Sequence, residues 1–159
     1  MKTLVVYYSR TGTTARLAHK ISEMLEADSD RIVSKTSYDG SLGYWRGAFH
    51  TLNDTNVAIE DAKLSPAKYD LVIVGGPVWG ARIANPVRTY LRQHGSEFKS
   101  MAFFATQGGP RPGISFKQMA TMSGKQPIAT LSVSSGKLSR PSGDEAVRAF
   151  VEKIRSALA

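Results

Sequence analysis

The stretch VVYYSRTGTTARLAHKI, residues 5–21, decides the fold class of this chain. Its first four residues end the run KTLVVYY, residues 2–8, whose β-branched and aromatic residues are typical of a strand buried on both faces. Beyond a cluster of hydroxyl residues, apolar side chains recur at helical spacing from Leu17 to Leu25. This spacing predicts an amphipathic helix that ends near Glu26. A buried strand that turns directly into a helix is typical of parallel sheets.

The same order of strand and helix continues along the rest of the chain. Further strands are predicted over RIVSKT (31–36), YDLVIVGG (69–76), MAFFAT (101–106) and PIATLSVS (127–134). Helices are predicted over 44–54, 85–95 and 114–122, and from Ser142 to the C-terminal region.

Several of these helices carry end signals or an apolar stripe. Asn85 is expected to cap its helix, with Pro86 at the first position and Gly95 at the end, and Ser142 with Glu145 forms a capping-box pattern. In the helix over 44–54, the stripe predicts packing over the sheet, and a packing role for Trp45 is favoured over a ligand contact. The stripe consists of Trp45, Ala48, Phe49 and Leu52.

Five strands alternating with helices predict an α/β fold, a doubly wound five-stranded parallel sheet with helices on both faces. A chain of 159 residues fits one domain over residues 1–159, because a chain of about this length buries roughly 70% of its unfolded surface in one core. The N-terminus shows no export pattern and no apolar run is long enough to span a bilayer, so a cytoplasmic location is expected.

Composition limits the chemistry. The chain has no cysteine, which removes thiolate nucleophiles and cysteine-ligated metal sites, and its three histidines are too far apart in sequence to suggest a metal site. The net charge is +8, and its whole excess lies in residues 80–159, which hold twelve Lys and Arg against four Asp and Glu. Such a field could attract an acidic partner, an anionic membrane surface or nucleic acid. Nucleic-acid binding is disfavoured, because no aromatic-basic strand platform and no recognition helix are visible.

The loop after the first strand has the composition of an anion site. Ser9, Thr11, Thr13 and Thr14 surround Gly12 at the expected start of a helix, where unpaired N–H groups and the helix dipole attract a phosphate. No G-K-[ST] sequence is present, and a single glycine cannot make G-x-G-x-x-G, so the common nucleotide-binding loops are excluded. Receiver domains and low-molecular-weight phosphotyrosine phosphatases are excluded as well, because the loop holds neither acidic residues nor a cysteine.

At these residues the chain resembles the flavodoxins and flavodoxin-like FMN proteins. Ser9, Thr11, Gly12 and Thr14 match the S/T-x-T-G-x-T phosphate loop of that family, and the turns after the strands over 69–76 and 101–106 are similar to its two ring-binding loops. The resemblance implies a strand order of 2-1-3-4-5 and FMN as the cofactor. The FMN-binding residues it implies are Ser9, Arg10, Thr11, Gly12, Thr13 and Thr14 at the phosphate, Pro77, Val78, Trp79 and Gly80 beside the ring, and Thr106, Gln107, Gly108 and Gly109 at the pyrimidine edge.

The resemblance further implies a redox protein that transfers electrons through its flavin, with no catalytic side chain. The first interpretation is an electron carrier with an acidic redox partner protein. The alternative is an FMN-dependent NAD(P)H/quinone oxidoreductase or a protoporphyrinogen-oxidase-like enzyme, acting on a small-molecule electron acceptor with possible peripheral membrane contact.

Unlike typical flavodoxins, which are acidic around the flavin, this chain has basic residues in the loops expected there, so we expect a less reducing flavin. These are Arg10, Arg82, Arg111, Lys137 and Arg140. The loop TQGGPRPG (106–113) also lacks an aromatic residue, which predicts an open face of the ring.

Overall fold

The computed structural model describes residues 1–108 and 113–159. Its sheet has five parallel strands in the order β2-β1-β3-β5-β6, and a short strand β4 pairs antiparallel with β3. The strands are β1 (Thr3–Tyr7), β2 (Asp28–Arg31), β3 (Leu71–Trp79), β4 (Arg82–Ile83), β5 (Ser100–Gln107) and β6 (Thr130–Ser134). With β4 set aside, this is the expected order 2-1-3-4-5, so the predicted fold class is confirmed.

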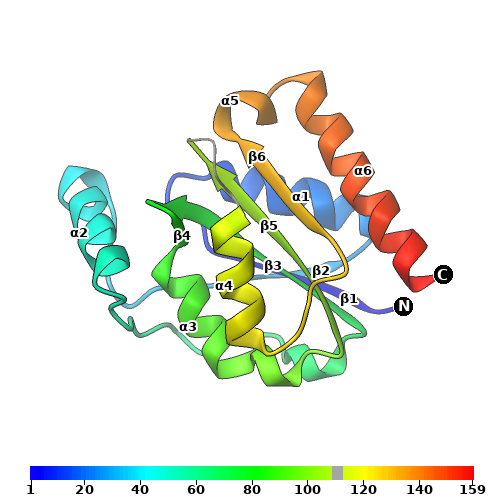
Figure 1. Cartoon of the computed structure of the whole chain (residues 1–159), viewed down its shortest axis with the longest axis horizontal. Helices are drawn as coiled ribbons and strands as arrows, with labels where there is room; N and C mark the ends of the chain where they lie inside the picture. Colours follow the sequence, from blue (N-terminus) through cyan, green and yellow to red (C-terminus); the bar gives the residue numbers. More distant parts are fainter. Residues whose placement is uncertain (109–112) are drawn as a thin grey trace.

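Helices cover both faces of the sheet (Figure 1). One face packs against α1 (Thr13–Leu25) and α6 (Pro141–Leu158), and the other against α3 (Asn85–His94) and α4 (Gly113–Ser123). The remaining helical segments are α2 (Gly40–Leu52), α5 (Ser135–Leu138), and the 3-10 turns η1 (Pro66–Lys68) and η2 (Gly95–Glu97). Among the described residues, none of these helices is long and apolar enough to cross a bilayer.

The centre of the core lies between β1 and β3, where every residue of β1 is buried. Two glycines in β3 allow close packing near the carboxyl end of the strand. A Cβ on Gly75 would lie 2.5 Å from the Phe104 ring, and a Cβ on Gly76 would lie 2.6 Å from Val87. The GG pair therefore serves the packing of β5 and α3 against β3.

The second strand lies earlier in the chain than predicted. It was expected over 31–36, whereas β2 pairs Asp28 to Arg31 with β1. Beyond β2, Ser34 forms an isolated antiparallel bridge with Ile59 outside the sheet. The polar residues of β2 are compatible with an edge strand, because their side chains can bind solvent or neighbouring backbone groups. The carboxylate of Asp30, which is buried, accepts the backbone N–H groups of residues 63 and 64.

Two predicted helix caps are wrong. α3 has no side-chain cap hydrogen bond, because the side chain of Asn85 is instead bonded to His50, Thr51 and Thr55. α6 begins at Pro141 without a side-chain cap bond, so the predicted capping box does not form. Proline at the first helical positions starts both helices without such a bond, because it needs no N–H partner there.

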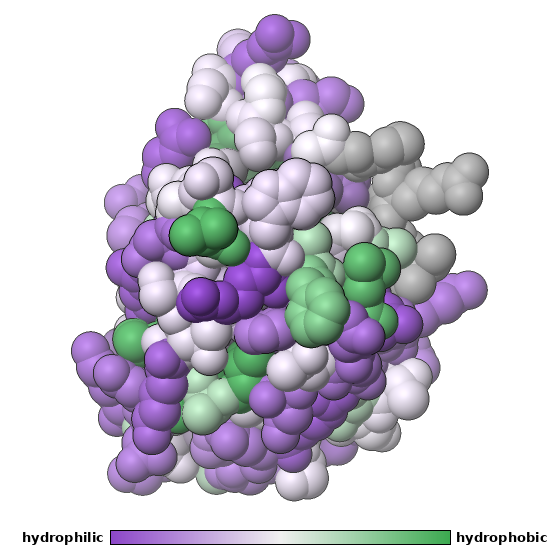
Figure 2. All heavy atoms as spheres, turned by 90° about the vertical axis from the view of Figure 1, so that its left-hand side faces the viewer, coloured by the Kyte–Doolittle hydropathy of each residue, from purple (hydrophilic) through white to green (hydrophobic). Residues whose placement is uncertain are grey.

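The apolar stripe of α2 faces solvent instead of the sheet. The helix starts at Gly40, earlier than predicted, and buries only Gly43, Gly47 and Thr51. Its large apolar side chains are exposed, Trp45 at 70% and Leu52 at 79%, and apolar side chains protrude among polar ones on this side of the molecule (Figure 2). The expected packing of this stripe over the sheet, and of Trp45 in particular, is therefore wrong.

Candidate functional site

The loop after β1 presents the open N-terminus of α1 to solvent. Gly12 is the N-cap residue with φ 95°, a left-handed conformation that favours glycine, and the helix has no side-chain cap hydrogen bond. The Gly12 N–H is donated to Ser9 Oγ at 3.1 Å, which closes the turn. The amides of the first helical turn lack intrahelical acceptors and lie at the positive end of the helix dipole, so this turn can hold a phosphate.

The four hydroxyl residues of this loop divide into two pairs. Ser9 and Thr14 are buried and form internal hydrogen bonds, and Thr14 Oγ1 lies 2.7 Å from Thr106 Oγ1 at the end of β5. Thr11 is exposed and Thr13 is half-buried, so their hydroxyls remain accessible. The Thr14–Thr106 bond thus ties together two of the three loops that the sequence assigns to one site.

The third loop holds a tryptophan against an aromatic cluster. Trp79 ends β3 and pairs with Arg82 across the hairpin to β4, whose turn contains Gly80 at φ 64°. The Trp79 ring is half-buried, with its centroid 4.9 Å from that of Tyr38 and 5.8 Å from that of Tyr8 in an edge-to-face contact. These contacts fix the orientation of the indole at the end of the sheet.

The three loops enclose one cleft of about 140 Å³ at the carboxyl ends of β1, β3 and β5. Most of the predicted site residues line it, namely Arg10, Thr11, Thr13, Thr14, Pro77, Val78, Trp79, Thr106, Gln107 and Gly108. Ser9 lines a neighbouring groove, Gly80 lines a smaller hollow beside the cleft, and Gly12 caps α1 next to it. The predicted residue Gly109 lies outside the described residues.

Two lining residues, Tyr44 and Ser135, escaped the sequence reasoning. Ser135 follows β6 directly, so the rule that ligands lie at the carboxyl ends of parallel strands could have included it. Tyr44 lies on α2, far from any strand end in sequence. No local signal marked it, because the apolar stripe of that helix predicted a different face toward the sheet.

Arg10 is the one basic side chain among the described residues that line the cleft. Three other basic loop residues expected near it do not line the cleft: Arg82 donates to the Thr51 carbonyl, and Lys137 and Arg140 are exposed. The fourth, Arg111, lies outside the described residues. The sequence therefore overestimated the positive charge that faces the cleft itself.

A second concentration of positive charge lies in a groove of about 600 Å³ that adjoins the phosphate loop. Its cationic residues are Arg10, Arg31, Lys35 and Lys63, and within residues 1–108 and 113–159 none of them forms an ion pair. Burial, together with the neighbouring Tyr38 and Asp39, raises the pKa of the Tyr8 phenol in this groove to about 12. Tyr8 therefore stays neutral at physiological pH, and the groove is cationic.

The cleft suits a phosphorylated ligand that carries a flat ring. It has an open helix N-terminus for the phosphate, an aromatic wall, and an opposite edge at Gln107 and Gly108 where an added Cβ on the glycine would touch nothing within 4 Å. Among the described lining residues, only Arg10 and Tyr44 carry ionisable side chains, and none is a His, Asp, Glu or Lys. Redox chemistry there would be supplied by a bound cofactor.

Comparisons with known proteins agree with this geometry. A family model described as flavodoxin matches residues 2–154. A provisionally named flavoprotein from Bacteroides eggerthii is 27% identical over 97% of this chain and 98% of its own, with a TM-score of 0.80. A flavoprotein from Lactobacillus acidophilus, solved in complex with FMN, is 22% identical over 84% of this chain and 91% of its own, with a TM-score of 0.66.

Oxidised flavodoxin 2 from Bacillus cereus shares the fold at 15% identity, with a TM-score of 0.63 over 98% of this chain and 99% of its own. Among curated proteins, no sequence matches the chain.

Proposed function

This chain belongs to the flavodoxin family, and from that premise we propose that it binds FMN and carries electrons between partner proteins in the cytoplasm. The observation that carries the proposal is the cleft itself. It joins the open N-terminus of α1 to the aromatic wall at Trp79 and to the end of β5. The FMN phosphate would be held by the first-turn amides of α1 with Thr11 and Thr13, and the ring would lie between Trp79 and the Thr106–Gly108 edge.

The electron-carrier role is supported by what the cleft offers chemically. When bound, FMN supplies one- and two-electron chemistry at its ring. In the part of the chain that the structure describes, the cleft contains no His, Asp, Glu or Lys that could transfer a proton to a substrate near neutral pH. The residues would therefore bind and orient the cofactor, and electron transfer needs no other group.

An acidic redox protein is the partner that fits the charge. The unpaired cations of the groove adjoin the phosphate loop, and Arg10 is common to the groove and the cleft. Opposite charges on two partners speed their encounter, and salt screens the effect, since the Debye length falls from about 10 Å at 0.1 M to about 3 Å at 1 M.

The experiment starts with reconstitution by FMN and chemical reduction of the yellow protein. Electron transfer to an acidic redox protein is then followed by stopped flow from 50 mM to 500 mM salt. We expect a rate that falls steeply with salt, and a slower rate for Lys35→Gln and Lys63→Gln than for the matched control Lys68→Gln, whose exposed lysine lies on η1 outside the groove. A salt-independent rate, equal in all three variants, would contradict this partner.

A second candidate function is the reduction of a small apolar acceptor such as a quinone, with NAD(P)H as the electron source. The exposed apolar side chains of α2 favour it, because this helix also contributes Tyr44 to the cleft. NADPH oxidation measured with and without a soluble quinone separates the two functions. Quinone-dependent turnover well above that of free FMN would support the enzyme, and its absence would support the carrier.

A further inference from the structure

The described residues at the end of β5 and just after it bring no aromatic side chain to the cleft. The ones that line it are Thr106, Gln107 and Gly108. The whole segment TQGGPRPG contains none. A second aromatic side chain nevertheless lines the cleft, and it comes from a different element. Tyr44, in the first half of α2, lines the cleft together with Trp79.

The position of α2 beside Trp79 is set by glycines. A Cβ on Gly43 would lie 2.0 Å from the carbonyl carbon of Tyr38, so only glycine allows the helix this close to the preceding segment. A Cβ on Gly47 would lie 3.2 Å from the Trp79 ring, so the helix backbone is packed against the indole. Tyr44 is held one residue from the first of these contacts and one helical turn from the second.

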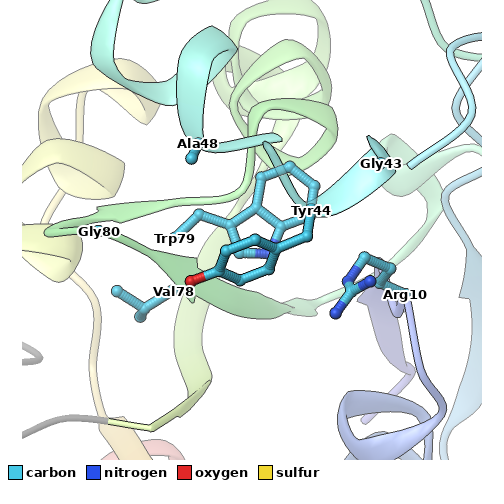
Figure 3. A pocket seen from close by; sticks show the side chains of 7 residues that line it. All are labelled: Arg10, Gly43, Tyr44, Ala48, Val78, Trp79 and Gly80. Carbon is cyan, nitrogen blue, oxygen red and sulfur yellow. The ribbon is translucent and has the colours of Figure 1, made fainter. Parts of the chain in front are cut away.

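Tyr44 and Trp79 also share a hollow of about 90 Å³ with Arg10 (Figure 3). The Arg10 guanidinium carbon lies 5.9 Å from the centroid of the Tyr44 ring, within range of a cation–π contact. Figure 3 shows the Tyr44 ring in front of the indole, with Arg10 beside it. The phosphate loop and α2 therefore meet at the mouth of the cleft through these two side chains.

We propose that Tyr44 is a second ring-binding aromatic of the flavin site, supplied by α2 instead of the β5 loop. The inference rests on the proposed binding of FMN. Tyr44 is 59% exposed and lines the cleft together with Trp79, so contact with a flat ring would remove apolar surface from water. The Arg10 guanidinium lies on the same side of the cleft, within cation–π range of the Tyr44 ring.

This role predicts a specific pattern of affinities, measured by titrating the protein with FMN and with riboflavin. Replacing Tyr44 by Leu removes the ring contact, so the dissociation constants of both ligands should rise by the same factor, about tenfold. Tyr44→Phe keeps the ring and should stay within about threefold of the wild type. The matched control is Phe49→Leu, which removes an equally exposed ring from the same helix outside the cleft.

Fluorescence of the bound flavin provides a second readout that does not depend on activity. Electron transfer from a phenol quenches flavin emission, whereas a phenyl ring does not quench it. Emission per bound flavin should therefore rise in both Tyr44→Leu and Tyr44→Phe and remain at the wild-type level in Phe49→Leu. Urea midpoints of all variants show whether the fold is retained, which the exposure of Tyr44 and Phe49 favours.

Equal affinities and emission in the wild type and Tyr44→Leu would overturn the inference and leave the proposed function intact. So would a loss confined to FMN, because that pattern locates the effect at the phosphate. A wild-type protein that binds neither FMN nor riboflavin would overturn the proposed function and this inference with it.

Discussion

Replacing Asn85 by Ala should weaken the protein by removing the polar link between α3 and the segment that carries α2. The Asn85 side chain is 2% exposed. Its Nδ2 donates to the carbonyls of His50 at 3.2 Å and Thr55 at 2.5 Å, and its Oδ1 accepts from Thr51 Oγ1 at 3.0 Å. One buried amide thus joins three residues at the C-terminal end of α2 and just beyond it.

The magnitude follows from the groups left without partners. Thr51 Oγ1 retains a hydrogen bond to the Gly47 carbonyl, and the His50 carbonyl still accepts the backbone N–H of Thr55, so their losses are small. The Thr55 carbonyl loses the partner that Asn85 provides. An orphaned buried polar group costs about 1–3 kcal/mol, and water entering the space left by the side chain offsets part of this. We expect a loss of about 2 kcal/mol in the free energy of unfolding.

Urea denaturation followed by far-UV circular dichroism measures this loss. With an m-value of about 2 kcal/mol/M, the midpoint should fall by about 1 M. The control is Asn53→Ala, since Asn53 is exposed and donates to a single carbonyl at the end of the same helix. Its cost should stay below about 0.5 kcal/mol. Equal midpoints for the two variants would refute the reasoning that the buried amide anchors this segment.

Three further predictions concern the cleft and its surroundings. Gly12→Ala forces alanine to φ 95° and should lower the free energy of unfolding by about 1 kcal/mol, as should Gly80→Ala at φ 64°. Only the Gly12 variant should bind FMN more weakly relative to riboflavin, which calorimetric titration with both ligands checks. Arg10→Gln should lower the flavin's reduction potential by tens of millivolts, because a charge about 6 Å away at an effective dielectric of about 20 gives roughly 100 mV before solvent screening. Photoreduction with reference dyes measures the potential, and an equal shift in Arg82→Gln would contradict the prediction. The pKa of Tyr8 is raised from 10.0 to about 12 in the folded protein, so the unfolded chain loses this proton first as pH rises. The stability present below pH 10 should therefore fall between pH 10 and 12. Tyr8→Phe should make the urea midpoint fall less steeply over this range, and an unchanged pH dependence would count against the prediction.

The fold could be predicted from the sequence because its strongest signals are local. β1, β3 and β5 are apolar runs ended by turn residues, and burial on both faces of a parallel sheet produces that pattern. β2 was misplaced because an edge strand of charged residues has no such pattern, and its register depends on Asp30 reaching the backbone of residues 63 and 64.

The cleft could be predicted in part for the same reason, since most of its residues lie at strand ends. What the sequence could not show was the orientation of α2. Its apolar stripe has helical spacing but turns outward, because Gly43 and Gly47 allow closer backbone approach than any side chain could. The same close approach brings Tyr44 to the cleft, so one misread helix accounts both for the wrong packing of Trp45 and for the missed Tyr44.

α2 is attached to the protein mainly by hydrogen bonds and glycine contacts, while its large apolar side chains are already in water. Detaching this helix alone would uncover the Trp79 ring beneath Gly47 but none of the helix's own large apolar side chains. It would therefore expose much less new apolar surface than global unfolding, and both heat capacity and denaturant sensitivity scale with that surface. Amides of Tyr44 to Leu52 should therefore exchange hydrogen at rates that hardly respond to low urea, whereas those of α1, which buries Leu17 and Ile21, should follow global unfolding. The free energy that holds α2 in place would change nearly linearly with temperature. The free energy of unfolding of the sheet core, in contrast, would curve strongly and pass through a maximum.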